Sequence, residues 1–276
     1  MKRTGYRLCY IEPRVRISAL CTVFDAMRDA DYSFDGESHD FWESVFVIDG
    51  EAGITAGETV YTLSAGQMIF HPPGEFHRLW NNKNDSLHIA IITFVADKFP
   101  INKHTICKSP EKEKILSVIS ALRSSFETYK ICIAERKDCE MSPSEQKAIN
   151  ALEELFLDLT QDFSREKKEN LKKDRQSELY SKAISTMKEN LGVRLSATEI
   201  ADACNVSLSA LQKMFYRYTG MGVMKYYESV RMERAKALLS DGYLVKETAE
   251  ALGYPDQNYF SSAYKRYFGT SPSKRN

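Results

Sequence analysis

The sequence predicts a multidomain α+β protein, with a β-rich N-terminal part followed by an all-α C-terminal part. Up to about Val95, short runs rich in β-branched and aromatic residues alternate with turn residues. After Pro110, apolar residues instead recur at helical spacing. The last hundred residues contain one pattern twice, a short helix, a tight turn and a second helix. A chain of 276 residues has room for about two domains of ~100–200 residues each.

The first 110 residues are expected to form a small β-barrel or sandwich. Turn residues such as Asp49-Gly50, Ala65-Gly66 and Pro72-Pro73-Gly74 separate the predicted strands, as in folds built from many short strands. The clearest runs are 44–48, 58–63, 67–70 and 87–95.

Residues 111–164 are predicted to form two helices, for packing or dimerisation. The second begins near Ser142-Pro143, because serine caps a helix and proline fits its first turn. Its apolar stripe either packs on the barrel of its own chain or pairs with another subunit. Residues 165–176, REKKENLKKDRQ, are nearly all charged or polar and are the expected linker between domains.

Residues 177–276 are expected to be a DNA-binding domain with two helix-turn-helix units. The first unit, about 195–216, starts with a capping box of Ser196 and Glu199. Asn205 suits the left-handed end of the first helix, and Ser207 caps the second helix.

The second unit, about 245–268, repeats this arrangement, and a helix over 223–240 joins the two. At ~1.5 Å per residue this helix is roughly 27 Å long, which suits two recognition helices about one DNA turn (~34 Å) apart. Short polar and basic side chains on the outer faces suit contacts with base edges and phosphates. These predicted DNA-binding residues are Ser209, Gln212, Lys213, Gln257, Asn258, Tyr259, Ser261, Ser262 and Lys265.

Composition and charge agree with a nucleic-acid reader joined to another domain. The net charge is zero, but residues 177–276 carry 14 basic and 10 acidic residues. The sequence predicts neither a secretory signal nor a membrane span. The six cysteines form no C-x-x-C pair, which favours buried thiols in a reducing cytoplasm.

Residues 231–275 resemble the signature of the AraC/XylS family of bacterial transcription regulators. The matching positions include Leu252-Gly253-Tyr254, Tyr259-Phe260-Ser261, Phe268-Gly269 and Ser271-Pro272. The resemblance implies a cytoplasmic bacterial regulator of double-stranded promoter or operator DNA. It also implies an activator that contacts RNA polymerase, and a homodimer.

The N-terminal part resembles a cupin, a double-stranded β-barrel. Residues 66–81 match the motif G-x5-P-x-G-x2-H-x3-N, and residues 37–50 match H-x-H-x3-E-x6-G except that Glu37 replaces the first histidine. In cupin enzymes these positions hold a divalent metal. Residues 37, 39 and 43 share parity and therefore one strand face. Glu37, His39, Glu43 and His77 would then make a mixed site for Zn²⁺, Mn²⁺ or Fe²⁺.

The alternative is that these polar groups are inherited scaffold lining an effector pocket, and no cofactor is expected. The barrel is predicted to bind a small-molecule effector. The candidate pocket residues are His39, Trp42, Glu43, Phe46, Tyr61, Phe70, His77, Trp80 and His88.

Three functions compete for this architecture. The first is an effector-responsive transcription regulator without catalytic residues. The second is a cupin metalloenzyme, an isomerase or dioxygenase, with an appended helical domain. The third is a constitutive DNA-binding protein with a mute barrel. The tandem units favour a regulator, because an enzyme needs no second recognition helix.

Overall fold

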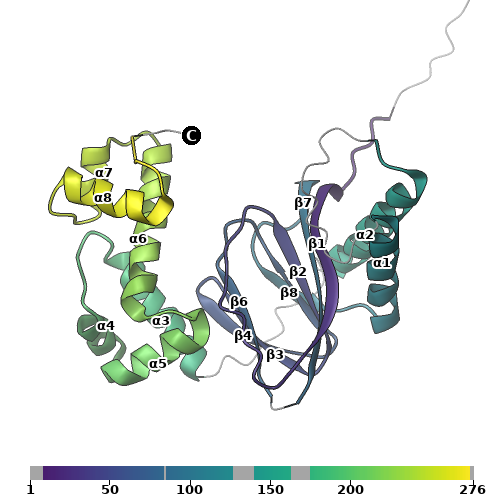
Figure 1. Ribbon diagram of the computed structural model, residues 1–276, viewed down its shortest axis with the longest axis horizontal. Coiled ribbons are helices and arrows are strands. Elements are labelled where there is room, and N and C mark those ends of the chain that lie inside the picture. The colour runs from purple at the N-terminus through teal and green to yellow at the C-terminus, as the bar shows by residue number, and fades with distance from the viewer. Residues whose placement is uncertain (1–8, 84, 127–139, 163–174, 274–276) are drawn as a thin grey trace, which may run out of the picture.

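The fold consists of a β-barrel, a pair of helices on one side of it and a helical domain on the other (Figure 1). A computed structural model describes residues 9–83, 85–126, 140–162 and 175–273. Within these residues no helix is long and apolar enough to cross a membrane.

Two antiparallel sheets form the barrel, as the cupin resemblance predicted. In the larger sheet the order is β1 (Arg16–Arg28), β7 (Leu87–Lys98), β2 (Trp42–Asp49), β5 (Gln67–His71) and β8 (Thr105–Lys108). In the smaller sheet the order is β4 (Thr59–Ser64), β3 (Glu51–Ala56) and β6 (His77–Asn81). Residues such as Val45, Ile54, Leu63 and Ile69 fill the space between the sheets.

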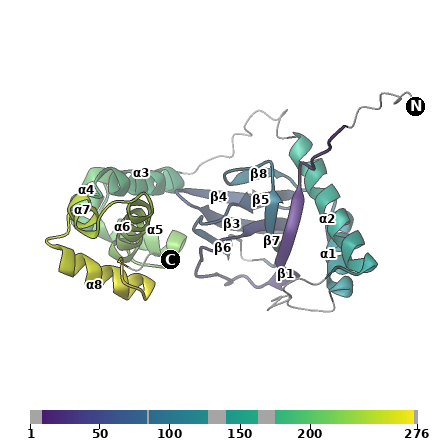
Figure 2. The same cartoon turned by 90° about the horizontal axis from the view of Figure 1, so that it is seen from above.

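The outer face of the larger sheet is covered by α1 (Lys112–Ser125) and α2 (Pro143–Asp162) (Figure 2). Ser142 caps α2 as predicted, since its Oγ accepts from the Glu145 amide and the Glu145 carboxylate accepts from the Ser142 amide. The apolar stripe of α2, including Leu152 and Phe156, is buried against the barrel. Of the two uses predicted for this stripe, the structure shows packing on its own barrel.

The helical domain contains α3 (Arg175–Glu189), α4 (Ala197–Cys204), α5 (Leu208–Thr219), α6 (Val223–Ser240), α7 (Val245–Ala251) and α8 (Gln257–Phe268). The local signals in its first unit are confirmed. Ser196 and Glu199 form the capping box, and Asn205 has a left-handed φ of 58°. Residues 165–174 of the predicted linker lie outside the described residues, and Arg175 and Gln176 begin α3.

The barrel and the helical domain share a hydrophobic cluster. Val60 on β4 and Trp80 on β6 pack among buried residues of α3, α5 and α6. The Trp80 ring lies 5.8 Å from the Tyr218 ring, centroid to centroid. The first helix-turn-helix unit therefore packs directly against the smaller sheet.

Candidate functional site

The predicted DNA-reading face is formed by the outer sides of α5 and α8. Both helices bury their apolar sides, Leu211, Met214 and Phe215 in α5 and Phe260 and Ala263 in α8. The remaining sides face solvent. Of the predicted DNA-binding residues Ser261 is half-buried, and the exposed ones are Ser209, Gln212, Lys213, Gln257, Asn258, Tyr259, Ser262 and Lys265.

Local contacts hold α8 on the connecting helix α6. Asp256 caps α8, because its Oδ1 accepts from the Asn258 and Tyr259 amides at 2.8 Å each. The buried guanidinium of Arg231 on α6 lies over the Tyr254 ring, 4.2 Å from its centroid, and donates to the Leu252 carbonyl. The second helix-turn-helix unit is thus fixed to α6, the helix that connects it to the first unit.

A groove of about 630 Å³ runs beside α5. Gln212 and Lys213 line it, as do three residues that were not among the predicted DNA-binding residues, Tyr216, Arg217 and Lys225. Their basic and aromatic side chains lie on the same surface as the predicted base-reading residues, which suits phosphate contacts. Tyr216 lies four residues after Gln212, so helical spacing puts it on the same face, but the sequence gives no sign that α6 adds Lys225.

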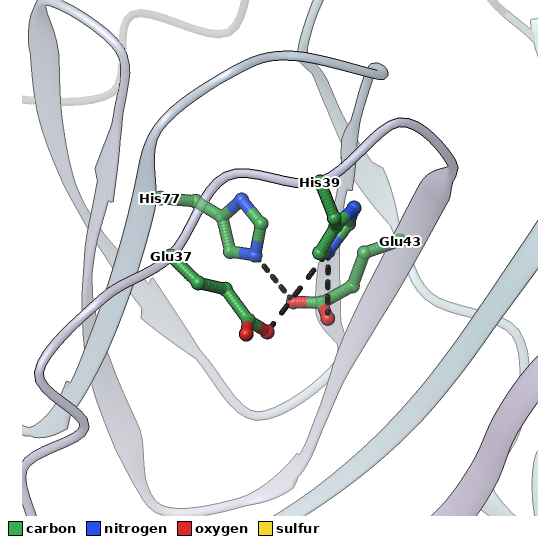
Figure 3. A group of neighbouring side chains, drawn as sticks. All are labelled: Glu37, His39, Glu43 and His77. Carbon is green, nitrogen blue, oxygen red and sulfur yellow. Dashed lines mark ion pairs between the residues drawn. The ribbon is translucent and has the colours of Figure 1, made fainter. Parts of the chain in front are cut away.

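A second candidate site lies in the barrel, where Glu37, His39, Glu43 and His77 converge (Figure 3). One potential ligand atom from each residue lies within 4.8 Å of the others. His77 Nε2 is 3.5 Å from Glu43 Oε1, and His39 Nε2 is 3.8 Å from Glu43 Oε2 and 4.0 Å from Glu37 Oε1. Three of these side chains are largely enclosed, whereas that of Glu37 is 51% exposed.

The backbone sets the orientation of both imidazoles. His39 Nδ1 lies 3.0 Å from the Phe41 carbonyl, and His77 Nδ1 lies 3.0 Å from the Glu75 carbonyl. A carbonyl accepts only, so each Nδ1 carries a proton, and either ring presents a lone pair at Nε2 when it is neutral. Both Nε2 atoms are buried without a hydrogen-bond partner among the described residues. Metal-binding histidines in proteins are held in this way, with one nitrogen anchored and the other directed at the ion.

The charge states favour a negative cluster at neutral pH. Burial lowers the pKa of His77 to about 4 although the Glu43 carboxylate opposes it, so His77 is neutral. Burial raises the pKa of Glu43, but the nearby histidines outweigh it and hold that pKa below its usual value. Burial and the charge of Glu43 raise the pKa of Glu37. For His39 burial lowers the pKa, and the two carboxylates outweigh it and raise the pKa overall.

The donor set fits a divalent cation. Two imidazole nitrogens and two carboxylates are ligands that Zn²⁺, Mn²⁺ and Fe²⁺ accept. The two unpartnered Nε2 atoms are the observation that supports the fit, because a buried lone pair without a donor is costly. The set of four ligand groups is therefore complete, although Glu37 stands where the cupin motif has a histidine.

A second polar network adjoins this cluster and was not predicted. His71 faces Glu43 across β5 and β2, and its ring stacks on His77 with centroids 4.6 Å apart. Its Nδ1 lies 2.9 Å from Glu75 Oε2, while Glu75 Oε1 lies 2.6 Å from His104 Nδ1. Only the parity of His71 with Ile69, a residue of the barrel interior, could have signalled this position from the sequence.

Five of the predicted pocket residues do not line the barrel. Trp42, Phe46 and Phe70 point to the outer face of the large sheet, where α1 and α2 cover them. On the same face, His88 lies 3.1 Å from Asp25. Trp80 points toward the helical domain. Both faces of the large sheet are buried, so an aromatic residue suits either face, but Trp42 and Phe46 have the opposite parity to Glu43 on β2 and therefore point outward.

The other four predicted pocket residues lie close to one another at the barrel cluster and the adjoining network. His39, Glu43 and His77 form the cluster, and the Tyr61 hydroxyl joins the adjoining network through His104 Nε2, 3.1 Å away. A cleft of about 780 Å³ opens beside them, between the barrel rim and the helical domain. Its lining includes Ser38, Gly74, Glu75, Tyr226 and Tyr267. This volume is in the range of small-molecule sites.

Two family models match the chain, one in each of these regions. A helix-turn-helix domain matches residues 200–275, and a cupin domain matches residues 31–94. The first covers α5 and α8, and the second includes all four residues of the barrel cluster.

Similar proteins span most of the chain. The Msm operon regulatory protein of Streptococcus mutans is 23% identical over 89% of this chain and 87% of its own length. The transcriptional activator RhaR of Mannheimia succiniciproducens is 22% identical over 86% of this chain and 84% of its own length. Among solved structures, an AraC-type DNA-binding domain from Chromobacterium violaceum is 32% identical, covering 33% of this chain and 83% of that one, with a TM-score of 0.32.

Proposed function

We propose that an effector bound at the barrel cluster controls the binding of this protein to promoter DNA. The proposal starts from a chain that is a DNA-binding transcription regulator of the AraC/XylS type. The observation that carries this proposal is the pair of buried, unpartnered Nε2 atoms of His39 and His77. An enclosed group of acceptors beside an ionised carboxylate needs a cation or a donor to complete it. A barrel that binds no effector would not require these enclosed acceptor atoms.

A divalent cation is the occupant that this group of atoms fits best, either alone or as the anchor of a polar effector. When bound, the cation would supply a positive charge to which oxygen atoms of an effector bind. Glu37 is the half-exposed ligand, while Glu43 and the two histidines form the enclosed side. The adjacent cleft offers room for a small molecule.

We assign no catalytic role to the cluster. The alternative of a cupin metalloenzyme has the same four residues in its favour, but it leaves two exposed recognition faces without a purpose. The long relatives are regulators by name, which also favours sensing over catalysis.

Elemental analysis and calorimetric titration of protein purified without a His-tag test the cation. We expect one equivalent of Zn²⁺, Mn²⁺ or Fe²⁺ per chain, and a loss of binding of at least tenfold in Glu43→Gln. Asp25→Asn is a matched control, because that carboxylate pairs with His88 on the opposite face of the sheet. A metal content near zero together with a flat titration would refute the cation, and thermal-shift screening of metabolites would then test an organic effector alone.

The remaining regulatory properties rest on the resemblance to AraC/XylS regulators. We propose that the protein acts in the bacterial cytoplasm as a homodimer, and that it activates transcription by contacting RNA polymerase. Since the apolar stripe of α2 is buried within the chain, dimerisation needs another surface. Sedimentation velocity tests the dimer, and transcription from a target promoter with purified polymerase tests activation.

A further inference from the structure

We infer that Arg78 and Thr55 form a clamp on the end of the first recognition helix, and that occupancy of the barrel cluster releases this clamp. The inference rests on the proposed occupancy of the cluster. It concerns the smaller sheet, whose outer side packs against the helical domain.

The clamp acts on the C-terminal carbonyls of α5. The last carbonyls of an α-helix carry its negative dipole end and most lack a partner within the helix, although that of Tyr216 also accepts from the Gly220 amide. The Arg78 guanidinium donates from Nη1 to the Tyr216 carbonyl, at 2.9 Å, and to the Arg217 carbonyl. The Thr55 hydroxyl on the neighbouring strand β3 donates to the Tyr218 carbonyl at 2.5 Å. Arg78 and Thr55 are both buried, so water does not compete freely for these bonds.

The segment 33–37 completes the clamp. Arg78 Nη2 donates to Ser33 Oγ and Arg78 Nε donates to the Phe34 carbonyl, both at 2.7 Å. The next carbonyl, that of Asp35, lies against Gly220 at the end of α5, where an added Cβ would be only 2.8 Å from the oxygen. A chain segment and a strand therefore grip the end of α5 together.

Both parts of this grip lead directly into the barrel cluster. The segment ends at Glu37, whose amide and carbonyl pair with those of His77 at 3.0 and 2.9 Å. His77 precedes Arg78 on β6, so the two side chains point to opposite faces of the sheet. Glu37 and His77 are thus candidate ligands on the inner side of the sheet. Residues close to them in the chain, Asp35 and Arg78, contact the end of α5 on the outer side.

Cation binding requires the ligand atoms of these four side chains to draw together. Ligand atoms about 2.1 Å from an ion are at most ~4.2 Å apart, whereas the cluster atoms now span up to 4.8 Å. Glu37 is the least enclosed ligand and belongs to the segment that contacts Gly220. Drawing Glu37 inward pulls this segment away from the end of α5. The first unit is then free to align with α8 on DNA, so occupancy raises DNA affinity.

Binding of a selected DNA site by the full-length chain, with Zn²⁺ or with a chelator, tests this clamp. In the wild type we expect Zn²⁺ to tighten binding at least fivefold, a common size for coupling between sites. Arg78→Ala should bind DNA without Zn²⁺ about as tightly as the wild type does with it, with the remaining Zn²⁺ effect below twofold. Thr55→Val keeps the side-chain shape but removes the hydroxyl donor. It should likewise raise the affinity for DNA in the absence of Zn²⁺.

Arg16→Ala is the matched control, because Arg16 is an exposed barrel arginine on β1 that pairs with Asp97. It should keep the full Zn²⁺ effect. Hydrogen exchange gives a second readout: Zn²⁺ should speed exchange at residues 216–220 in the wild type and leave it unchanged in Arg78→Ala.

The inference is wrong if Arg78→Ala and Thr55→Val keep the wild-type response, or if both weaken DNA binding. A flat Zn²⁺ titration of the wild type would overturn the proposed occupant and the inference with it. Tight Zn²⁺ binding with no change in DNA affinity or exchange would overturn the clamp alone.

Discussion

His77 and Arg78 are consecutive on β6 and serve opposite sides of the sheet. His77 Nε2 lies 3.5 Å from Glu43 Oε1 inside the barrel, and Arg78 Nη1 lies 2.9 Å from the Tyr216 carbonyl on the helical domain. One peptide unit therefore separates the candidate sensing site from the end of a recognition helix. The structure thus gives a short route between the two functions that the sequence predicts.

The amide side chains of α8 should read bases, whereas one lysine on each recognition helix should bind phosphates. Gln257→Ala and Asn258→Ala are expected to change which base pairs are preferred, at a cost of about 1–3 kcal/mol on the best site. Lys213→Ala and Lys265→Ala should weaken binding to all sequences and reduce the salt slope by about one. Titrations of specific and scrambled DNA at several salt concentrations distinguish the two effects. Identical behaviour of all four variants would contradict this division.

The cap of α8 should matter for DNA binding. Asp256→Ala removes the acceptor for the Asn258 and Tyr259 amides, so the first turn that presents Gln257 should fray. A lost N-cap costs about 1 kcal/mol, which corresponds to roughly fivefold in affinity if the turn must re-form on DNA. Asp202→Ala, at an exposed position of α4, is the control. Equal DNA affinity of the two variants would argue against an ordered α8 terminus in recognition.

The buried neutral His77 should make the barrel less stable in acid. Burial lowers its pKa to about 4, while the unfolded residue titrates near 6.5. Between these values the unfolded chain binds more protons, so the free energy of unfolding decreases as the pH falls. For chelated, metal-free protein this contribution is about 2 kcal/mol between pH 7 and pH 5.

Urea unfolding at the two pH values measures this loss. Both tryptophans of the chain, Trp42 and Trp80, lie in the barrel, so their fluorescence reports on that domain. His77→Gln should lack most of the difference. A variant as acid-sensitive as the wild type would show that His77 is not the group responsible.

The sequence predicted the helical domain well because its signals are local. Ser196 with Glu199, Asn205 and Ser207 act on amides and carbonyls within a few residues, so their spacing determines where helices start and stop. The strands were harder to place. β1 and β8 each pair with strands distant in the chain, β7 and β5, and neither was among the predicted runs.

The candidate site was predicted in part. Glu37, His39 and Glu43 share parity, and all four cluster residues occupy spaced motif positions although Glu37 replaces the histidine there, which is enough to expect their convergence. The outward position of Phe46 follows from its parity opposite to Glu43 on β2, whereas that of Phe70 depends on how β5 pairs with β2, which is a tertiary contact. The roles of Arg78 and Thr55 are tertiary too, because their partners are backbone carbonyls of α5, whose sequence carries no sign of such contacts.

The most direct measurement of the central claim is the DNA affinity of the wild type and Glu43→Gln, each with Zn²⁺ and with a chelator. Glu43 is buried in the barrel cluster, where its carboxylate lies beside His39 and His77, so its substitution tests sensing apart from DNA contact. A barrel that controls DNA binding predicts at least fivefold tighter binding with Zn²⁺ in the wild type, and less than a twofold change in Glu43→Gln. Equal affinities in the wild type with and without Zn²⁺, although Zn²⁺ occupies the cluster, would contradict the account.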